Sequence, residues 1–315
     1  MDTQHQLPAA LFGLPKAVLR VLYRLGTKYP VFQAIFAREL RAIGATSWTA
    51  QLIDDFIHRP YGEAYGLTPK ERQTLVESFQ RNIATIQSGT PLSVHLVLAR
   101  EILQIPPTVV GDVVECGVWK GACSASLSLV CQRTERRLKV CDSFQGLPDD
   151  GTKRHVGLHT RVYGHYQAGQ FTGTLDEVRE NIARGGALSV CDFIQGFFED
   201  SLHQIDSPVA FAFLDVDLES STRDCLKALW PRLVTDGLLY CDDAGDLDVV
   251  RVYFDEPWWQ ETLHFPAPGF VGSGCGLPLS PTYTSIGYTR KTGAFDPSQW
   301  RKVPFLHYPE ENERT

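Results

Sequence analysis

Acidic residues follow two separate apolar segments, and their positions suggest metal chemistry. Asp215 and Asp217 follow the run Phe-Ala-Phe-Leu, while Asp242 and Asp243 follow the run Gly-Leu-Leu-Tyr-Cys. If both runs are strands of one parallel sheet, their carboxyl ends meet at the edge where ligands bind. Four carboxylates gathered there would repel one another unless they were protonated or neutralised by a cation, and such oxygen ligands suit Mg²⁺. We therefore predict a divalent-metal site, with a helix N-cap as the alternative role for Asp217.

A glycine-containing turn earlier in the chain predicts a second kind of binding. The stretch Glu115-Cys-Gly-Val-Trp-Lys-Gly121 is typical of a strand end, a tight turn and a helix start. Gly117 and Gly121 let the backbone turn and approach a ligand, and the helix start offers unpaired N–H groups. The pattern lacks the third glycine of the dinucleotide fingerprint G-x-G-x-x-G. It suits a ligand without a pyrophosphate, such as S-adenosylmethionine (SAM), whose ammonium group Glu115 would face.

The elements that must position these residues alternate along the chain. This alternation of strand-like and helical segments predicts a mostly parallel sheet with helices on both faces. Residues 282–289 are expected to add a last, antiparallel strand, and a helix over 246–256 is expected to end at Pro257. Asp142 ends the second strand, where a βαβ unit reaches the ribose hydroxyls of a nucleoside. The other strands are expected at 111–116, 137–142, 189–194, 209–215 and 236–241, and the helices at 69–86, 92–103, 122–132, 174–184 and 221–231.

Several motifs, in the right order, resemble the macrocin O-methyltransferase (TylF) family. They are ECGVWKGA, CDSFQGLP, IQGFFEDSL, FLDVDLESSTRDCL and DGLLYCDDAG, and they lie between about residues 108 and 246. The resemblance implies an α/β, Rossmann-like class I SAM methyltransferase sheet with an N-terminal helical cover over the cofactor site. It implies that Asp215, Asp242 and Asp243 bind the metal. The predicted cofactor-binding residues are Glu115, Gly117, Gly121, Asp142, Ser143 and Phe197.

The reaction implied is methyl transfer from SAM to a hydroxyl oxygen. A divalent cation would lower the pKa of that hydroxyl, and a carboxylate would take its proton. Asp215 is the first candidate for this base, ahead of Asp217 or a histidine of the 148–173 loop. The family's acceptors indicate a sugar hydroxyl on a secondary metabolite, and the family also implies a homo-oligomer. The alternatives are a non-catalytic SAM-fold binding or assembly protein and an NAD-dependent dehydrogenase.

Composition limits the classes of partner and the cellular compartment that we expect. The chain has 315 residues and a net charge of −7, which argues against a nucleic-acid partner. Its eight cysteines include no C-x-x-C pair and are typical of reduced, buried thiols, so we expect a cytoplasmic protein. A basic amphipathic helix expected over 7–45 favours packing or an oligomer contact over membrane association. We predict three regions, namely an N-terminal helical segment (1–107), the methyltransferase domain (108–291) and a tail (292–315).

Overall fold

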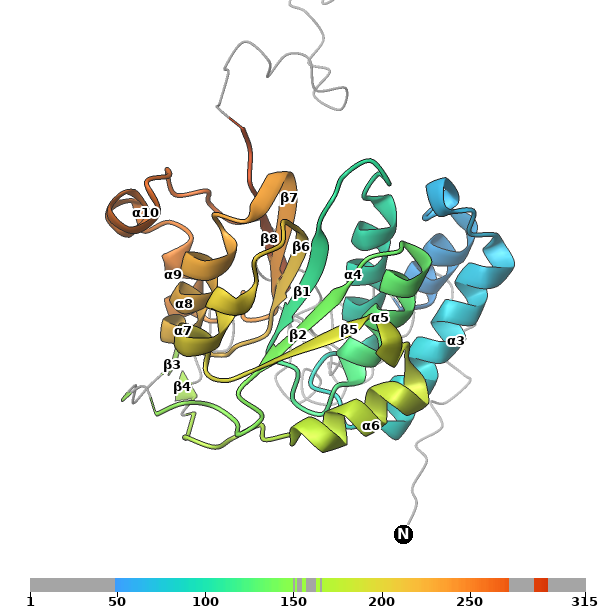
Figure 1. The fold of residues 1–315 in the computed structure, drawn as a ribbon, viewed down its shortest axis with the longest axis horizontal. Helices are drawn as coiled ribbons and strands as arrows, with labels where there is room; N and C mark the ends of the chain where they lie inside the picture. Colours follow the sequence, from blue (N-terminus) through green and yellow to red (C-terminus); the bar gives the residue numbers. More distant parts are fainter. Residues whose placement is uncertain are drawn as a thin grey trace, which may run out of the picture.

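A six-stranded sheet forms the centre of this computed structural model, which describes residues 49–149, 151, 155–156, 163–164, 166–271 and 286–293. Five neighbouring strands of the sheet are parallel, and the sixth, at one edge, is antiparallel to its neighbour. The predicted Rossmann-like α/β fold with a C-terminal antiparallel strand is therefore confirmed. In spatial order (Figure 1) the strands are β5 (Cys191–Gln195), β2 (Leu138–Asp142), β1 (Asp112–Cys116), β6 (Val209–Leu214), β7 (Leu233–Cys241) and β8 (Gly287–Arg290).

Each central strand buries apolar residues on both faces of the sheet. Val113 and Phe211 belong to one hydrophobic cluster, while their chain neighbours Val114 and Ala212 belong to the other, and all four are fully buried. Successive side chains of a strand point to opposite faces, so a continuous apolar run supplies both clusters. Helices must then cover both faces.

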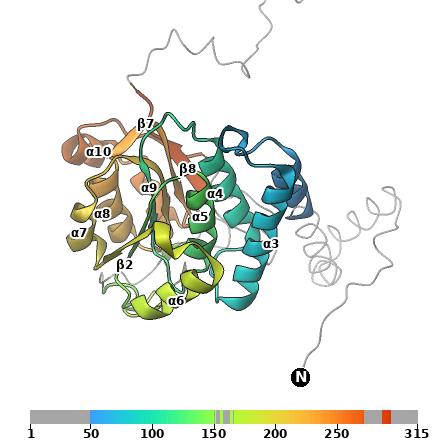
Figure 2. The same cartoon turned by 45° about the vertical axis from the view of Figure 1, so that its right-hand side comes forward.

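The helices divide into two groups, one on each face (Figures 1 and 2). A helix over 49–58, α3 (Pro69–Thr85), α4 (Leu92–Gln104), α5 (Ala122–Arg133) and α6 (Leu175–Gly185) lie on one side of the sheet. The other side carries α7 (Phe198–Ser201), α8 (Glu219–Leu229), α9 (Leu247–Val252) and α10 (Glu256–Leu263).

The helices before the first strand share the core of the sheet. Phe79 of α3 and Val94 of α4 are fully buried in the same cluster as Val113. Thr68 caps α3: its side chain accepts a hydrogen bond from the Glu71 N–H, and the Glu71 side chain accepts in return from the Thr68 N–H in a capping box. The predicted N-terminal helices are therefore present and pack on one face of the sheet, whereas their covering of a cofactor site stays a prediction. The boundaries of the three predicted regions stay predictions.

The expected helix over 246–256 is wrong in its ending. The structure has two helices there, because α9 ends at Val252 and α10 begins at Glu256. Asp255 caps α10 by accepting from the Trp258 N–H, and Pro257 lies in the first turn. Proline lacks only an N–H that the first turn would leave unpaired, so it starts a helix as readily as it ends one.

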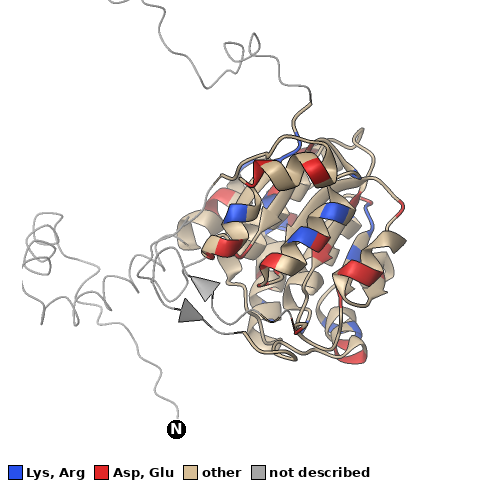
Figure 3. Ribbon diagram, turned by 90° about the vertical axis from the view of Figure 1, so that its left-hand side faces the viewer, with Lys and Arg blue, Asp and Glu red and all other residues tan. Residues whose placement is uncertain are grey.

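Charged residues of both signs are interspersed on the face that carries α7 to α10 (Figure 3). Arg223 of α8 shows the pattern, since it pairs with Glu219 and with Asp255, both at 2.8 Å.

Among the described residues, no helix is long and apolar enough to cross a membrane.

Several expectations fall outside the described residues. The helix expected over 7–45 lies there entirely, as does most of the expected tail. Within the 148–173 loop the structure describes a short antiparallel pair, β3 (His155–Val156) with β4 (Tyr163–Gly164), but not His159 or His165.

Candidate active site

One cavity of about 440 Å³ lies where β1, β2, β6 and β7 end. Parallel strands present their carboxyl ends at one edge of the sheet, so side chains distant in sequence meet there. Residues from all four strand ends line this cavity, together with parts of the 87–90 and 166–171 segments. The predicted site residues among its lining are Glu115, Gly117, Asp142, Ser143, Phe197, Asp215, Asp242 and Asp243.

Both predicted glycines have a left-handed backbone, but their surroundings differ. Gly117 has φ of 81°, and a Cβ there would lie 1.8 Å from the backbone oxygen of Asp215. Gly117 therefore lets the ends of β1 and β6 approach closely beside the cavity. Gly121 also has φ of 81°, yet a Cβ there would meet Val178 Cγ1 of α6 at 2.9 Å. Gly121 is not among the residues that line the cavity, so its role in binding a cofactor stays a prediction.

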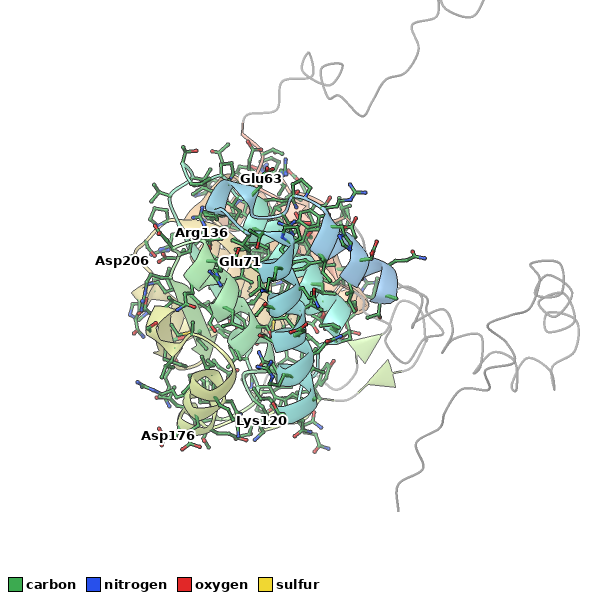
Figure 4. The ribbon with its side chains drawn as sticks, turned by 90° about the vertical axis from the view of Figure 1, so that its right-hand side faces the viewer. Glu63, Glu71, Lys120, Arg136, Asp176 and Asp206 are labelled. Atoms are coloured by element: carbon green, nitrogen blue, oxygen red, sulfur yellow. The ribbon has the colours of Figure 1, made fainter. Side chains whose placement is uncertain are left out.

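The turn between these glycines is anchored to α6. Lys120 Nζ lies 2.6 Å from Glu177 Oε2, and Asn181 Nδ2 donates to the Lys120 carbonyl at 2.9 Å. Figure 4 shows Lys120 at the same end of the molecule as Asp176. The first two turns of α6 thus fix the outer side of the glycine turn.

Glu115 is a fully buried carboxylate without a hydrogen-bond partner. Neither of its oxygens is hydrogen-bonded by a described residue. Burial raises the pKa of Glu115 to about 7, and the Asp142 charge raises it further, while the nearby Ser124 hydroxyl and Cys123 thiol lower it without forming a hydrogen bond of normal geometry. A buried polar group without a partner is destabilising, so Glu115 lacks a donor that a ligand can supply.

Asp142 holds the glycine turn through its own carboxylate. Its Oδ2 accepts from the Val118 N–H at 2.8 Å, and its Oδ1 accepts from the Phe144 N–H at 2.7 Å. Burial raises the pKa of Asp142, and these hydrogen bonds oppose the rise. Ser143 is also engaged locally, since its Oγ donates to the Gly146 carbonyl at 2.7 Å. A carboxylate oxygen has two lone pairs, so Asp142 keeps acceptor capacity for a ligand.

The acidic residues predicted at the ends of β6 and β7 do gather in the cavity. Burial, and then the charges of Asp242 and Asp243, hold the pKa of Asp215 well above its usual range. Within the described residues no side chain donates to or pairs with the Asp215 carboxylate. Asp217 has φ of 61°, and burial raises its pKa to about 6. It does not cap α8: the N-cap position is Leu218, without a side-chain bond.

Asp243 already has a structural role. Its Oδ2 accepts hydrogen bonds from the backbone N–H groups of Val216 (3.0 Å) and Asp217 (2.9 Å). This carboxylate therefore fixes the turn that follows β6, and Oδ1 is the oxygen left for other ligands. Burial and the neighbouring Asp217 charge hold the pKa of Asp243 well above its usual range.

The donor set suits a hard cation in its chemistry. Carboxylates crowded in a buried site resist ionisation, as the raised pKa values of Asp215 and Asp243 show, and a divalent cation would relieve that repulsion. In the described part of the chain, however, no three His, Cys, Asp or Glu side chains converge closely enough to hold a metal ion as they stand. The metal-binding role of Asp215, Asp242 and Asp243 stays a prediction.

An aromatic wall in the cavity was not predicted. The Phe171 ring packs edge-on against Trp119 at 5.8 Å and against Tyr166 at 6.3 Å between centroids. The Tyr166 hydroxyl lies 3.5 Å from Asp246 Oδ2. Burial and the charge of Asp217 raise the pKa of Tyr166, so it stays protonated and can donate. The sequence signal was only the aromatic content of the 148–173 loop.

Phe197, predicted from the resemblance alone, lines the same cavity. It precedes α7 and keeps 39% of its surface exposed. An exposed aromatic ring at a cavity wall is available for stacking on a flat ligand.

Comparisons with known proteins find one O-methyltransferase family and individual O-methyltransferases. The model of the Macrocin-O-methyltransferase (TylF) family matches residues 98–266. The chain is 38% identical over 149 residues to the Streptomyces olivaceus 8-demethyl-8-(2,3-dimethoxy-alpha-L-rhamnosyl)-tetracenomycin-C 4'-O-methyltransferase, covering 45% of this chain and 56% of that protein. It is 34% identical over 141 residues to the Streptomyces niveus demethyldecarbamoylnovobiocin O-methyltransferase, covering 43% of this chain and 53% of that protein. The chain thus matches little more than half the length of these relatives.

Among solved structures, the O-methyltransferase NovP matches with a TM-score of 0.47 and 19% identity, covering 79% of this chain and 99% of that one. The calicheamicin methyltransferase CalS11 matches with a TM-score of 0.43 and 18% identity, covering 70% of this chain and 92% of that one.

Proposed function

The chain belongs to the macrocin O-methyltransferase (TylF) family, and on that premise we propose that it transfers a methyl group from SAM to a hydroxyl oxygen of a glycosylated small molecule. The observation that carries this proposal is the shared cavity. The unpaired Glu115 carboxylate and the strand-end acids Asp215 and Asp242 line one space of about 440 Å³. One cavity with both features can hold a cationic cofactor next to a hydroxyl acceptor.

For the cofactor, Glu115 accepts from the ammonium group at the amino-acid end. This contact would give a buried carboxylate the charged donor that it lacks. Asp142 faces the ribose hydroxyls with its remaining acceptor capacity, while its bonds to Val118 and Phe144 keep it in place. Phe197 offers its exposed ring to the adenine.

For the metal, Asp215, Asp242 and Oδ1 of Asp243 are the proposed ligands. A bound divalent cation would lower the pKa of a coordinated hydroxyl and orient its oxygen. Asp243 contributes least freely, because its Oδ2 already accepts two backbone N–H groups.

The reaction needs a proton acceptor. As the methyl group passes from the sulfonium sulfur to the acceptor oxygen, the S–C bond breaks, the O–C bond forms and the hydroxyl proton leaves. Asp215 is the proposed base, because its carboxylate lies in the cavity with its pKa raised and accepts no hydrogen bond from the described residues. Asp217 is the second candidate, with a pKa of about 6.

The acceptor side of the cavity suits a sugar ring. A hexose has apolar C–H faces and a rim of hydroxyls, and the cavity offers the aromatic rings of Tyr166 and Phe171 near the carboxylate of Asp246. The Streptomyces olivaceus relative is named for a rhamnosyl acceptor, which supports the same class of substrate here.

The cofactor assignment is tested by calorimetric titration with S-adenosylhomocysteine (SAH). Wild-type protein should bind SAH, whereas Glu115→Gln should bind about ten- to a hundredfold more weakly, because the amide keeps an acceptor oxygen but loses the negative charge that pairs with the ammonium group. Glu180→Gln removes the same charge from an exposed position of α6 and should bind like wild type. Stabilisation by NAD instead of SAM in a melting experiment would favour the dehydrogenase.

The reaction itself is tested with SAM and a panel of glycosylated acceptors. Methyl transfer should stop in EDTA and return with Mg²⁺. Full activity in EDTA would contradict the metal assignment and leave the acids as a metal-free base and its neighbours. SAH binding without methyl transfer to any acceptor would favour the non-catalytic alternative.

A further inference from the structure

A fully buried histidine lies behind one wall of the cavity and takes no part in the reaction proposed above. His95 is on α4, and both of its ring nitrogens have partners. Its Nε2 lies 2.9 Å from Thr90 Oγ1, and its Nδ1 lies 3.0 Å from Ser126 Oγ on α5. Burial lowers the pKa of His95 to about 3, so the ring is neutral at any pH where the protein would be studied.

The hydrogen bonds around His95 join four helices. Asn82 of α3 donates to Ser126 Oγ at 3.2 Å and to the Gly185 carbonyl at the end of α6 at 3.1 Å. Ser126 Oγ donates to the Ala122 carbonyl at 3.3 Å. With that hydroxyl proton used, the consistent assignment has His95 Nδ1–H donating to Ser126 and Nε2 accepting from Thr90. The side-by-side course of α3 and α5 in Figures 2 and 4 brings these groups together.

At its other end the network reaches the cavity. Residues 87–90 form a loop that lines it, along with Glu115 and Trp119. The loop is folded by Ser88, whose Oγ donates to the Thr90 carbonyl at 2.8 Å. It also lies near the glycine turn, since a Cβ built on Gly89 would be 3.9 Å from Trp119 Cε3.

We propose that His95 is a positioning residue, which holds the 87–90 loop in place as a wall for the amino-acid end of the cofactor. The assignment of that ligand rests on the proposed function. His95 bonds Thr90 on one side and Ser126 on the other, and Ser126 is bonded to Ala122, the first residue of α5. The loop and the glycine turn are therefore both fixed to α5, which sets the spacing of the two walls beside Glu115.

Two amide substitutions at His95 separate the effects of its two hydrogen bonds. In His95→Asn the side-chain amide can replace Nδ1 and keep the bond to Ser126, but it cannot reach Thr90. In His95→Gln the amide can replace Nε2 and keep the bond to Thr90, but it loses Ser126. Both variants should lower Tm, because each leaves a buried polar group unpaired. Only His95→Asn should weaken SAH binding strongly, by up to about tenfold, with His95→Gln staying within about threefold of wild type.

A second pair of variants removes the same bond from the loop. Thr90→Val keeps the shape of the side chain but loses the hydroxyl, whereas Thr90→Ser keeps the hydroxyl. Thr90→Val should reproduce the loss of SAH affinity, and Thr90→Ser should not. This pair decides the matter if His95→Asn does not fold. Equal SAH affinities, within about twofold, for His95→Asn and His95→Gln and also for Thr90→Val and Thr90→Ser would overturn the proposal and leave His95 as a core residue.

Hydrogen exchange gives a readout that needs no ligand. Amides of residues 86–90 should exchange faster in His95→Asn and Thr90→Val than in wild type, while amides of α6 should be unchanged. Absence of this contrast would overturn the positioning role even if SAH binds. Failure of wild-type protein to bind SAH would instead overturn the proposed function and, with it, the assignment of the loop to a cofactor.

Discussion

The Asp142 carboxylate accepts a hydrogen bond from the backbone N–H of Val118 at 2.8 Å, so the last residue of β2 holds the turn that follows β1. The same carboxylate also accepts from Phe144 at 2.7 Å. A residue expected only to contact the ribose thus also holds the backbone that shapes the proposed cofactor site. Changes at Asp142 must be interpreted for stability as well as for binding.

We predict that the free energy of unfolding of Asp142→Ala is lower than that of wild type by about 1–3 kcal/mol, because two buried N–H groups lose their acceptor. Asp142→Asn should lose less, since its carbonyl oxygen still accepts one bond. Urea denaturation of the ligand-free proteins measures both, with Asp149→Ala as an exposed control. Wild-type stability in Asp142→Ala would mean that the bonds to Val118 and Phe144 carry no net stabilisation.

Gly117 and Gly66 form a matched pair for testing the close approach of β1 and β6. Both have positive φ (81° and 74°), but a Cβ at Gly66 meets nothing within 4 Å, whereas a Cβ at Gly117 lies 1.8 Å from the Asp215 oxygen. Gly66→Ala should therefore cost about 1–2 kcal/mol of backbone strain. Gly117→Ala should cost clearly more and also weaken SAH binding. Equal losses of unfolding free energy would show that the ends of β1 and β6 can separate freely.

The sheet could be predicted because its information is local. Each strand is a short apolar run with turn residues after it, and parallel pairing brings the ends of such runs to one edge. The amino-acid sequence alone was therefore enough to place Glu115, Asp142, Asp215 and Asp242 at a common site. The same local reasoning failed at Pro257, because a proline one residue inside a helix and a proline one residue beyond it look alike in sequence.

Contacts between distant segments could not be predicted. Tyr166 meets Asp246 across 80 positions of the chain, and no periodicity connects them. His95 reaches Ser126 from a helix whose sequence shows only one polar residue on an apolar face. Glu115 was predicted to face a cation, but the absence of any hydrogen bond to its buried oxygens from the described residues is visible only in three dimensions.

Binding of SAH should depend on pH through Glu115. Burial raises the pKa of this carboxyl to about 7, so it is mostly protonated at pH 6 and cannot attract an ammonium group well. We expect wild-type affinity to rise as pH increases from about 6 to 7.5, and the weaker affinity of Glu115→Gln to stay flat over the same range. Titration calorimetry at several pH values measures this. A wild-type affinity independent of pH would contradict the assignment of Glu115 to the ammonium group.

The last prediction concerns the stability of the metal-free protein. Asp215 and Asp243 have folded-state pKa values well above those of exposed aspartates, and Asp217 titrates at about 6. The folded protein therefore holds more protons than the unfolded chain between about pH 4 and 6 and above. Stability should then fall as pH rises through this window, and Glu115 contributes with the same sign.

Neutralising one member of the cluster should reverse part of that loss. In EDTA at pH 7.5, Asp215→Asn should melt roughly 2–4 °C above wild type, the shift that about 1 kcal/mol gives in a large domain, because an amide carries no buried charge and needs no proton to be taken up on folding. Mg²⁺ should then raise the Tm of wild type more than that of Asp215→Asn or Asp242→Asn. Asp176→Asn, an exposed change on α6, controls for net charge. A wild-type stability in EDTA that rises between pH 4.5 and 7 would contradict the repulsion between these acids. Equal stabilisation of all four proteins by Mg²⁺ would contradict the metal assignment.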